Sequence, residues 1–348
     1  MRVAIIAFNN IKYSPYIKTY TNLLERESVE YDVIIPNRSG INETINGNLL
    51  SLKWDKKKSK IYNFIRFARK TTKLLQKQNY NFVFVLTTLP AILLFPILIK
   101  KYSDRFLVDI RDYTYDKMPF FKNIEKLVLK KAHTRVLSSP AFKKFLPDLN
   151  YIICHNCPHK IEESVNVFNK ASNPIKIGYV GSVSYIKECK RLIDLVKLDD
   201  RFCFYFYGNE TSGSFISDYV KCLGINRIKF FGEYEPNEKA NIISDIDILF
   251  NDYGNHSDLV RCALSNKLYD SFFYKKPLLT SPDTIMSQMA DVYSFDVNET
   301  TTDLCALYEW YGEIDGEEMV AYMNSKLKQI NIENSKFEEK IIEIIGEL

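Results

Sequence analysis

The stretch SNKLYDSFFYKKPLLTS, residues 265–281, combines the signals of a helix and of a buried strand. Ser265 is a residue type that favours the position just before a helix, and the residue before Pro277 avoids helical backbone angles. The segment Pro277–Thr280 is short and apolar, as expected of a buried strand. The stretch therefore predicts a helix that starts at 265 and ends before 277, followed directly by a strand.

The first two turns of the predicted helix carry groups that suit a nucleoside diphosphate. The N–H groups at a helix N-terminus and the positive end of its dipole favour phosphate, and Lys267 adds a positive charge there. One turn further on, Asp270 suits a pair of ribose hydroxyls, as the acidic residue of dinucleotide sites does. The same residues also fit an ordinary amphipathic helix whose Lys and Asp face solvent, and a motif this short does not decide between the two interpretations.

The stretch resembles the signature of GT-B glycosyltransferases, in which Asn-Lys-Leu, an aromatic residue and an acid precede a strand that begins with proline. It is similar in particular to the family-4-like enzymes that build bacterial capsule and O-antigen polysaccharides. Ser265 stands where the usual residue is proline, and Lys275 where it is small. The resemblance is strongest from Ile175 to Ser281. It implies an α/β protein of the GT-B fold, with two Rossmann-like doubly wound domains facing a central cleft.

The length of 348 residues also favours two domains, because a single core rarely grows beyond about 250–300 residues. Both halves alternate strand-like and helix-like segments, as doubly wound sheets do. We expect an N-terminal Rossmann-like acceptor domain at 1–165 and a C-terminal Rossmann-like domain for the nucleotide-sugar donor at 172–325. The resemblance implies that residues 326–348 form a helix that packs back on the N-terminal domain.

The composition is that of a soluble globular protein, with 46% apolar and 26% charged residues. No uncharged apolar run reaches the roughly 18 residues of a membrane span, and the apolar run at the N-terminus is too short for a signal peptide. Seven scattered cysteines fit reduced thiols in a cytoplasm. We expect no metal, because Cys154 and Cys157 have no second pair at zinc-ligand spacing. We expect no cofactor beyond the nucleotide-sugar co-substrate, because the first strand is not followed by G-x-G-x-x-G.

Charge is distributed unevenly along the chain. Residues 1–165 carry 28 Lys and Arg against 14 Asp and Glu, a net charge of +14, whereas residues 166–348 carry 19 against 29. Between Lys53 and Lys73 there are nine basic residues and one acid. Such an excess indicates that the first half meets an anionic surface. No nucleic-acid-binding motif accompanies it, so we expect no nucleic-acid partner.

The segment Trp54–Lys73 predicts a basic amphipathic helix. Its apolar residues at helical spacing are Ile61, Phe64, Ile65 and Ala68. One interpretation is peripheral docking on the anionic inner face of the plasma membrane, where each basic residue contributes about 1 kcal/mol. Trp54, Phe64 and Phe67 would then settle at the headgroup boundary. The other interpretation is a domain helix whose solvated face happens to be basic.

The segment Phe106–Asp112 is an apolar strand that runs into acidic residues. Carboxyl ends of parallel strands face the ligand crevice of a doubly wound sheet. The segment resembles the D-x-R-D run of the same capsule enzymes, which makes Asp109 and Asp112 candidate catalytic residues. The alternative is an Asp–Arg pair that only satisfies a loop. The resemblance places three residues on the acceptor side: Asn9, Tyr16 and Arg111.

The segment Ile175–Lys187 restarts the strand–loop–helix pattern of the second domain. Gly181 lets the backbone approach a phosphate closely, and Lys187 can reach the phosphate oxygens. Ser182 stands where many relatives have an arginine, so Lys187 and Lys267 must supply the positive charge. The resemblance makes these two lysines catalytic candidates as well. The full set of candidate donor-binding residues is Gly181, Ser182, Lys187, Gly208, Glu233, Tyr234, Ser265, Asn266, Lys267, Leu268 and Asp270.

The resemblance implies a glycosyltransferase that moves a sugar from a nucleotide-diphosphate sugar to a polyprenyl-diphosphate-linked glycan in surface polysaccharide synthesis. It implies retention of anomeric configuration and no metal. The pair of acids with seven residues between them that many relatives carry is incomplete, because Cys262 occupies the first position and Asp270 the second. Two other functions stay open: a nucleotide-sugar epimerase of the GT-B fold, and a non-catalytic partner of a glycosyltransferase.

Overall fold

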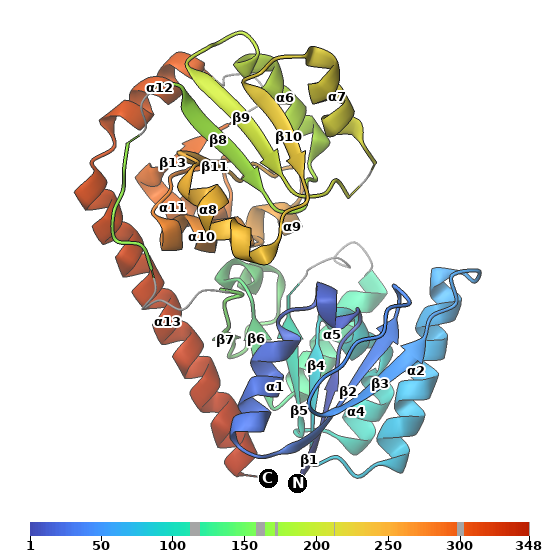
Figure 1. Ribbon diagram of the computed structural model, residues 1–348. Helices are drawn as coiled ribbons and strands as arrows, with labels where there is room; N and C mark the ends of the chain where they lie inside the picture. The colour runs from blue at the N-terminus through green and yellow to red at the C-terminus, as the bar shows by residue number, and fades with distance from the viewer. Residues whose placement is uncertain (112–118, 158–163, 171–172, 212, 298–302, 348) are drawn as a thin grey trace. The chain divides into compact units, whose positions relative to one another are not determined.

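A seven-stranded parallel sheet forms the first part of the computed structural model (Figure 1). Its strand order is β3-β2-β1-β4-β5-β6-β7. The strands are β1 (Arg2–Ile6), β2 (Glu30–Asn37), β3 (Asn48–Lys53), β4 (Phe82–Leu86), β5 (Phe106–Ile110), β6 (Thr134–Leu137) and β7 (Ile152–Ile153). The inner strands are almost wholly apolar and buried because helices cover both faces of a parallel sheet.

The helices of this part connect successive strands. They are α1 (Ile17–Arg26), α2 (Lys60–Lys77), α3 (Thr88–Leu93), α4 (Phe95–Lys101) and α5 (Pro119–Lys131). Short 3-10 turns lie at Ile11–Tyr13 and Pro140–Phe145. The structure describes residues 1–111, 119–157, 164–170, 173–211, 213–297 and 303–347.

A six-stranded parallel sheet forms the second part, with the order β10-β9-β8-β11-β12-β13. Its strands are β8 (Ile175–Val180), β9 (Phe202–Tyr207), β10 (Ile228–Gly232), β11 (Ile248–Phe250), β12 (Leu278–Thr280) and β13 (Ser294–Asp296). The chain builds outward from β8 to β10 and then returns to the other side of β8. The direction of strand order therefore reverses between β8 and β11, and doubly wound sheets bind ligands at such a reversal.

The helices of the second part are α6 (Ile186–Val196), α7 (Phe215–Leu223), α8 (Lys239–Ser244), α9 (Asp258–Cys262), α10 (Asn266–Tyr274), α11 (Ile285–Ala290) and α12 (Leu304–Glu313). The helix and strand predicted from residues 265–281 are α10 and β12. Short 3-10 turns lie at Pro236–Glu238 and Asp291–Tyr293. With two parallel sheets and helices between their strands, the predicted α/β fold class is confirmed.

The chain divides into two compact units, residues 1–156 with 332–348, and residues 157–331. The long helix α13 (Gly316–Gly346) contributes to both units. Its first half buries Met319, Met323, Leu327 and Ile330 in the core of the second unit. Its second half buries Phe337, Ile341, Ile344 and Ile345 in the core of the first. The first unit is therefore discontinuous in sequence.

Helix α2 differs from the predicted basic helix in its bounds and in its buried face. It starts at Lys60, after Ser59, whose hydroxyl accepts a hydrogen bond from the Tyr62 amide at 3.2 Å. Phe67 is buried, whereas Ile61 and Ile65, which we predicted on the apolar face, are 68% and 47% exposed. The buried residues of the helix are Asn63, Phe67, Thr71 and Leu75, and Phe64 of the predicted face also packs against Phe8.

Candidate functional site

Two glycine loops touch at the carboxyl ends of β8 and β9. Gly181 has φ +116° and Gly208 has φ +134°, angles that disfavour residues with side chains. A Cβ atom at Gly208 would lie 1.9 Å from the carbonyl oxygen of Gly181, so only glycine permits this approach. A Cβ atom at Gly181 would meet nothing within 4 Å. The space beside Gly181 is therefore open, while its amide donates a 2.8 Å hydrogen bond to the Tyr207 carbonyl.

Helix α6 begins directly after this loop, and its N-terminus has no side-chain cap hydrogen bond. The preceding residue, Tyr185, has left-handed backbone angles of φ 56° and ψ 53°. Lys187 lies in the first turn with its side chain exposed, and Ser182 is exposed in the loop. A helix N-terminus, exposed loop backbone and a lysine thus occur together at the strand end, which is the set of groups expected for phosphate.

A pocket of about 400 Å³, with polar side chains beside the apolar Ile186 and Val297, lies between the start of α6 and the loops that follow β11 and β12. Tyr185, Gly254 and Pro282 form part of its wall. Its other polar side chains are Lys187, Glu188, Arg191, Asn255, His256 and Ser281. The volume is within the range of small-molecule sites. The pocket lies entirely within the second unit, at the carboxyl edge of its sheet.

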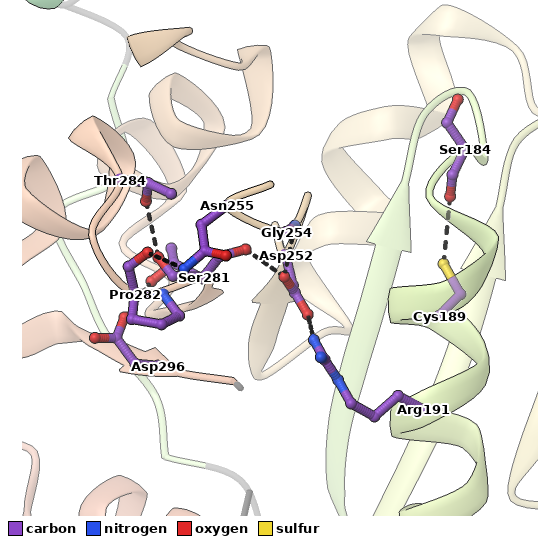
Figure 2. Close-up of polar contacts among 11 residues, drawn as sticks. Ser184, Cys189, Arg191, Asp252, Gly254, Asn255, Ser281, Pro282, Thr284 and Asp296 are labelled. Carbon is purple, nitrogen blue, oxygen red and sulfur yellow. Dashed lines mark hydrogen bonds and ion pairs between the residues drawn. The ribbon is translucent and has the colours of Figure 1, made fainter. Parts of the chain in front are cut away.

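A buried ion pair holds one wall of this pocket (Figure 2). Figure 2 shows Arg191 extending from α6 toward Asp252, which follows β11. The fully buried Asp252 carboxylate also accepts hydrogen bonds from the Ser281 hydroxyl and, at 3.0 Å, from the Gly254 amide. The ends of β11 and β12 are thereby tied to α6. Arg191 keeps a buried Nε that has no hydrogen-bond partner among the residues that the structure describes.

Lys267 is buried beneath aromatic rings rather than exposed at the helix N-terminus. Its Nζ lies 4.1 Å from the ring centroid of Tyr179 and donates a 3.0 Å hydrogen bond to the Tyr253 hydroxyl. The Tyr253 ring stacks on Tyr185 at 4.1 Å. Burial alone would lower the pKa of Lys267, but the oxygens of Tyr253 and Tyr179 outweigh it, and the pKa is raised. Lys267 therefore stays positively charged and holds Tyr253 in place against Tyr185, which immediately precedes α6.

The other candidate residues at or just before α10 lie in different surroundings. Ser265 does not cap the helix with its side chain; its hydroxyl donates to Asn251 Oδ1 at 2.7 Å. Leu268 is completely buried in the hydrophobic core, so its side chain is structural. Asp270 is 2% exposed and accepts a 2.7 Å hydrogen bond from Lys239 Nζ. Asn266 is the exposed candidate of this helix.

The predicted nucleobase loop follows β10. Glu233 is exposed and accepts a hydrogen bond from the amide of Asn209, which follows β9. Tyr234 is half-buried, and burial raises the pKa of its hydroxyl. The Gly208 amide donates a 2.6 Å hydrogen bond to the Gly232 carbonyl, which links the loops after β9 and β10. These candidates lie on neighbouring strand ends of one sheet.

In the first unit, Asp109 is fully buried and not open to a ligand. It accepts 2.8 Å hydrogen bonds from the Tyr20 hydroxyl and from Arg111 Nε. Burial raises the pKa of Asp109, against the opposing effect of Arg111. The Arg111 guanidinium also donates to the Cys154 carbonyl at 3.2 Å and lies 5.1 Å from the ring centroid of Tyr16. The alternative of an Asp–Arg pair that satisfies its own surroundings fits this geometry.

The remaining first-unit candidates lie near the start of α1 or beyond the described residues. Asn9 is half-buried, and its side-chain oxygen accepts a 3.0 Å hydrogen bond from the Asn10 amide. Tyr16 immediately precedes α1 and is half-buried against Arg111. Asp112 lies outside the described residues.

Among the residues that the structure describes, no three His, Cys, Asp or Glu side chains are grouped so as to hold a metal ion. The Asp245-Ile246-Asp247 run has the spacing of paired metal-binding carboxylates. It lies at the amino end of β11, where Asp245 pairs with Lys176 at 2.5 Å and Asp247 accepts the Lys176 amide at 2.7 Å. Within the same described residues, no helix is long and apolar enough to cross a bilayer.

Sequence reasoning identified Lys187 but missed other side chains at the pocket, above all Arg191 and His256 in its wall and Asp252, which pairs with Arg191. Two local signals pointed to Arg191 and Asp252. Arg191 follows Lys187 by four residues and so shares its helical face. Asp252 is an acid just beyond the apolar run at 248–250, at the carboxyl end of a strand, where ligands of parallel sheets bind.

No model of a protein family matches the sequence, and no curated protein sequence matches it. Solved structures match over the whole chain. Sucrose-phosphate synthase from Thermosynechococcus elongatus has a TM-score of 0.71 at 11% identity, with 100% of both chains covered. HepE of Anabaena in complex with UDP has a TM-score of 0.70 at 11% identity, covering 99% of this chain and 100% of that chain. The lipopolysaccharide outer core galactosyltransferase WaaB has a TM-score of 0.64 at 13% identity, with 100% of both chains covered.

The chain has the GT-B fold. The agreement extends through both units, because each match covers nearly the full length of both proteins. In the GT-B chain the glycine loops, the start of α6 and the polar pocket all belong to the second unit. This unit corresponds to the predicted donor half of the protein.

Proposed function

We propose that this GT-B protein is a glycosyltransferase that uses a nucleotide-diphosphate sugar as donor. The observation that carries the proposal is the meeting of two positive-φ glycine loops, the N-terminus of α6 and a polar pocket at one sheet edge. This is the edge at which doubly wound sheets bind nucleotides. The complex of HepE with UDP supports a nucleotide as the ligand.

In this proposal the donor diphosphate binds at the start of α6. The absence of a side chain at Gly181 leaves room for the phosphate oxygens. The amide of Ser182 and the ammonium of Lys187 approach these oxygens. They stabilise the charge that develops on the diphosphate as the bond to the sugar breaks, and preorganised donors of this kind are usually the largest catalytic contribution. Lys267 supports them from beneath Tyr253 and Tyr185. No metal is needed, and the sugar is transferred with retention.

The ribose end of the donor binds near α10 and the loop after β10. Asp270 accepts the ribose hydroxyls while Lys239 holds its carboxylate in place. Glu233 and Tyr234 border the nucleobase. The acceptor, a polyprenyl-diphosphate-linked glycan of a surface polysaccharide, binds to the first unit near Asn9 and Tyr16. WaaB, a lipopolysaccharide outer core galactosyltransferase of the same fold, supports a role in the synthesis of a surface glycan.

The proposal is tested by calorimetric titration with UDP and GDP, followed by donor hydrolysis with the matching nucleotide sugar. Lys187→Ala should weaken binding of the diphosphate by about 10- to 100-fold, the value of a hydrogen bond to a charged group, and leave binding of the free nucleoside unchanged. Lys190→Ala is the matched control, because Lys190 lies on the same helix and pairs with Asp194 at 2.8 Å. Wild-type protein that binds neither diphosphate would refute the assignment.

We further propose that the first unit docks on the anionic inner face of the plasma membrane through α2 and the residues just before it. Lys56, Lys57, Lys58 and Lys60 are exposed there. Ile61, Tyr62 and Ile65 are 68%, 45% and 47% exposed on the first two turns of the helix. An exposed apolar stripe beside a basic cluster is typical of a helix that lies in the membrane interface.

The apolar contribution to docking comes from different side chains than the sequence indicated. Phe64 packs against Phe8 and Trp54, with ring centroids 5.1 and 6.0 Å away, and Phe67 is buried. Phe64 and Phe67 therefore stabilise the first unit. Ile61 and Ile65 take the role at the headgroup boundary that we had assigned to aromatic residues.

Co-sedimentation with vesicles checks the docking surface. Replacing Lys56 and Lys57 with Glu should abolish binding to vesicles with anionic lipid, whereas Ile61→Ser should weaken the binding that remains at high salt. Replacing Lys221 and Lys229 with Glu is the control, because both are exposed in the acidic second unit. Equal binding of wild-type protein to neutral and anionic vesicles would reject this part of the proposal and leave donor binding untouched.

A further inference from the structure

The polar pocket beside α6 carries balanced charges. Lys187 and Arg191 are its cationic side chains, and Glu188 contributes a buried carboxylate to its wall. Arg191 is already paired with the buried Asp252. With that pair included, two positive groups face two negative ones. The pocket therefore lacks the excess positive charge that would offset burial of another anion.

Hydrogen-bond donors and acceptors converge at one point of the pocket. A Cβ atom at Gly254 would lie 2.8 Å from Glu188 Oε1 and 2.9 Å from His256 Nδ1, so a group the size of a methyl there touches both. Gly254 has φ +72°, which also favours glycine. The amide of Asn255 lines the same side. A carboxylate accepts hydrogen bonds, a side-chain amide donates and accepts them, and an imidazole nitrogen either donates or accepts one. Together these groups match a ligand with hydroxyl groups, which donate and accept hydrogen bonds at once.

A rigid aromatic ring closes another side of the pocket. Tyr185 stacks on Tyr253 with the two rings inclined by only 12°. Tyr253 is held in turn by the hydrogen bond from Lys267. A ring fixed in this way offers an apolar surface to the C–H face of a sugar, while the polar groups opposite meet its hydroxyls.

We infer that this pocket receives the sugar of the donor and selects an uncharged hexose over a sugar that carries a carboxylate. The inference rests on the proposed function, because Lys187 belongs both to the pocket and to the proposed diphosphate site. Glu188 is the element that rejects an acidic sugar, because a carboxylate placed in the pocket meets a like charge in a buried setting. Arg191 cannot compensate fully, since Asp252 already neutralises it.

Calorimetric titration of the full-length protein tests the inference with UDP, UDP-glucose, UDP-galactose and UDP-glucuronic acid. If the nucleotide screen selects guanine, the probes are GDP, GDP-mannose and GDP-mannuronic acid. At least one uncharged sugar nucleotide should bind more tightly than the nucleoside diphosphate alone. The acidic sugar nucleotide should bind about tenfold or more weakly than that one. Tighter binding of the acidic sugar would overturn the inference.

Two isosteric variants of α6 identify the residue responsible. Glu188→Gln removes the like charge and should reduce the discrimination against the acidic sugar at least fivefold. Asp194→Asn is the control, because Asp194 lies on the same helix, outside the pocket, and is paired with Lys190 and Lys197. It should leave the ratio unchanged. An unchanged ratio in Glu188→Gln, or an equal change in both variants, would show that Glu188 does not select the sugar.

The outcomes separate this inference from the proposed function. If the nucleoside diphosphate binds but an attached sugar adds nothing to its affinity, the sugar lies elsewhere and donor binding still stands. If no nucleoside diphosphate binds, the proposed function falls and the sugar assignment falls with it. Circular dichroism of each variant shows whether a loss of preference for the uncharged sugar is caused by a loss of folded structure.

Discussion

Replacing Asp252 with asparagine should destabilise the second unit by about 3 kcal/mol. The substitution keeps the shape of the side chain and removes the charge that Arg191 and the Ser281 hydroxyl share. Breaking a buried ion pair by removing one partner costs roughly 3–5 kcal/mol. We expect the lower end, because the Arg191 side chain is 17% exposed and regains some hydration. Ser281→Ala removes one hydrogen bond to a charged acceptor and should cost about 1.5–2 kcal/mol.

Tryptophan fluorescence during urea unfolding measures this cost in the unit concerned. The chain has two tryptophans, Trp54 in the first unit and Trp310 in the second. In a Trp54→Phe background the signal reports the second unit alone. The matched control is Asp258→Asn, which breaks an ion pair with Arg261 whose two side chains are 44% and 45% exposed. It should cost less than about 1 kcal/mol, as surface pairs do.

The double variant of Asp252 and Ser281 tests whether the network acts as one unit. If it does, the double variant should cost less than the sum of the two single variants by about 1 kcal/mol, because each removes the same hydrogen bond. A cost of Asp252→Asn no greater than that of Asp258→Asn would refute the reasoning. It would mean that the buried pair contributes nothing to holding α6 against the strand ends.

Three further substitutions have clear expectations. Gly208→Ala should destabilise the second unit by at least about 2 kcal/mol and abolish nucleotide binding, because its Cβ would collide with the Gly181 carbonyl; Gly312→Ala, with open space around it, should be harmless in the same urea assay. Burial raises the pKa of Glu125 to about 7. The folded state therefore binds the extra proton, and stability should fall as pH rises from about 4.5 to about 7; Glu125→Gln should remove that slope in urea midpoints taken at pH 5 and 8. Burial lowers the pKa of Lys275 to about 8. The unfolded state binds the extra proton between about 8 and 10.5, so stability should rise over that interval, and Lys275→Met should flatten the rise.

The second unit was largely predictable where its signals are local. The helix and strand between 265 and 281 are α10 and β12, because a proline and an apolar run restrict the neighbouring backbone directly. Ser265 precedes the helix without a side-chain cap hydrogen bond. The same holds for the loop at Gly181, because glycine has no side chain and readily adopts the positive φ found there. Signals of this kind act over a few residues, so the local sequence is enough to predict the structure they produce.

The buried face of α2 was not predictable in the same way. Ile61 and Phe67 are both apolar and belong to different stripes of the helix. Ile61 is 68% exposed, whereas Phe67 packs against the ring of Phe8 at 5.1 Å, and Phe8 lies about sixty residues earlier in the chain. The choice between two apolar stripes is made by packing against a distant segment, and helical periodicity does not contain it.

The candidate site was predictable in part for the same reason. Lys187 and Gly181 lie at the predicted sheet edge because motif and position agree. Lys267 follows the motif in sequence, yet it is covered by tyrosines from other segments. The pair of Arg191 and Asp252 joins positions 61 residues apart, and nothing in either local sequence specifies that contact. Long-range polar pairs of this kind emerge only from the fold.

Helix α13 has a consequence for how the protein is made. The first unit needs Phe337, Ile341 and Ile344 to complete its core, and these residues are synthesised long after residue 156. At about 5–20 residues per second, the interval from residue 156 to residue 332 is roughly 10–35 s. During that time the apolar surface that α13 will cover stays exposed to solvent. The second unit, which is continuous from 157 to 331, can close its core first, so the two units should mature in the reverse of the order in which they leave the ribosome.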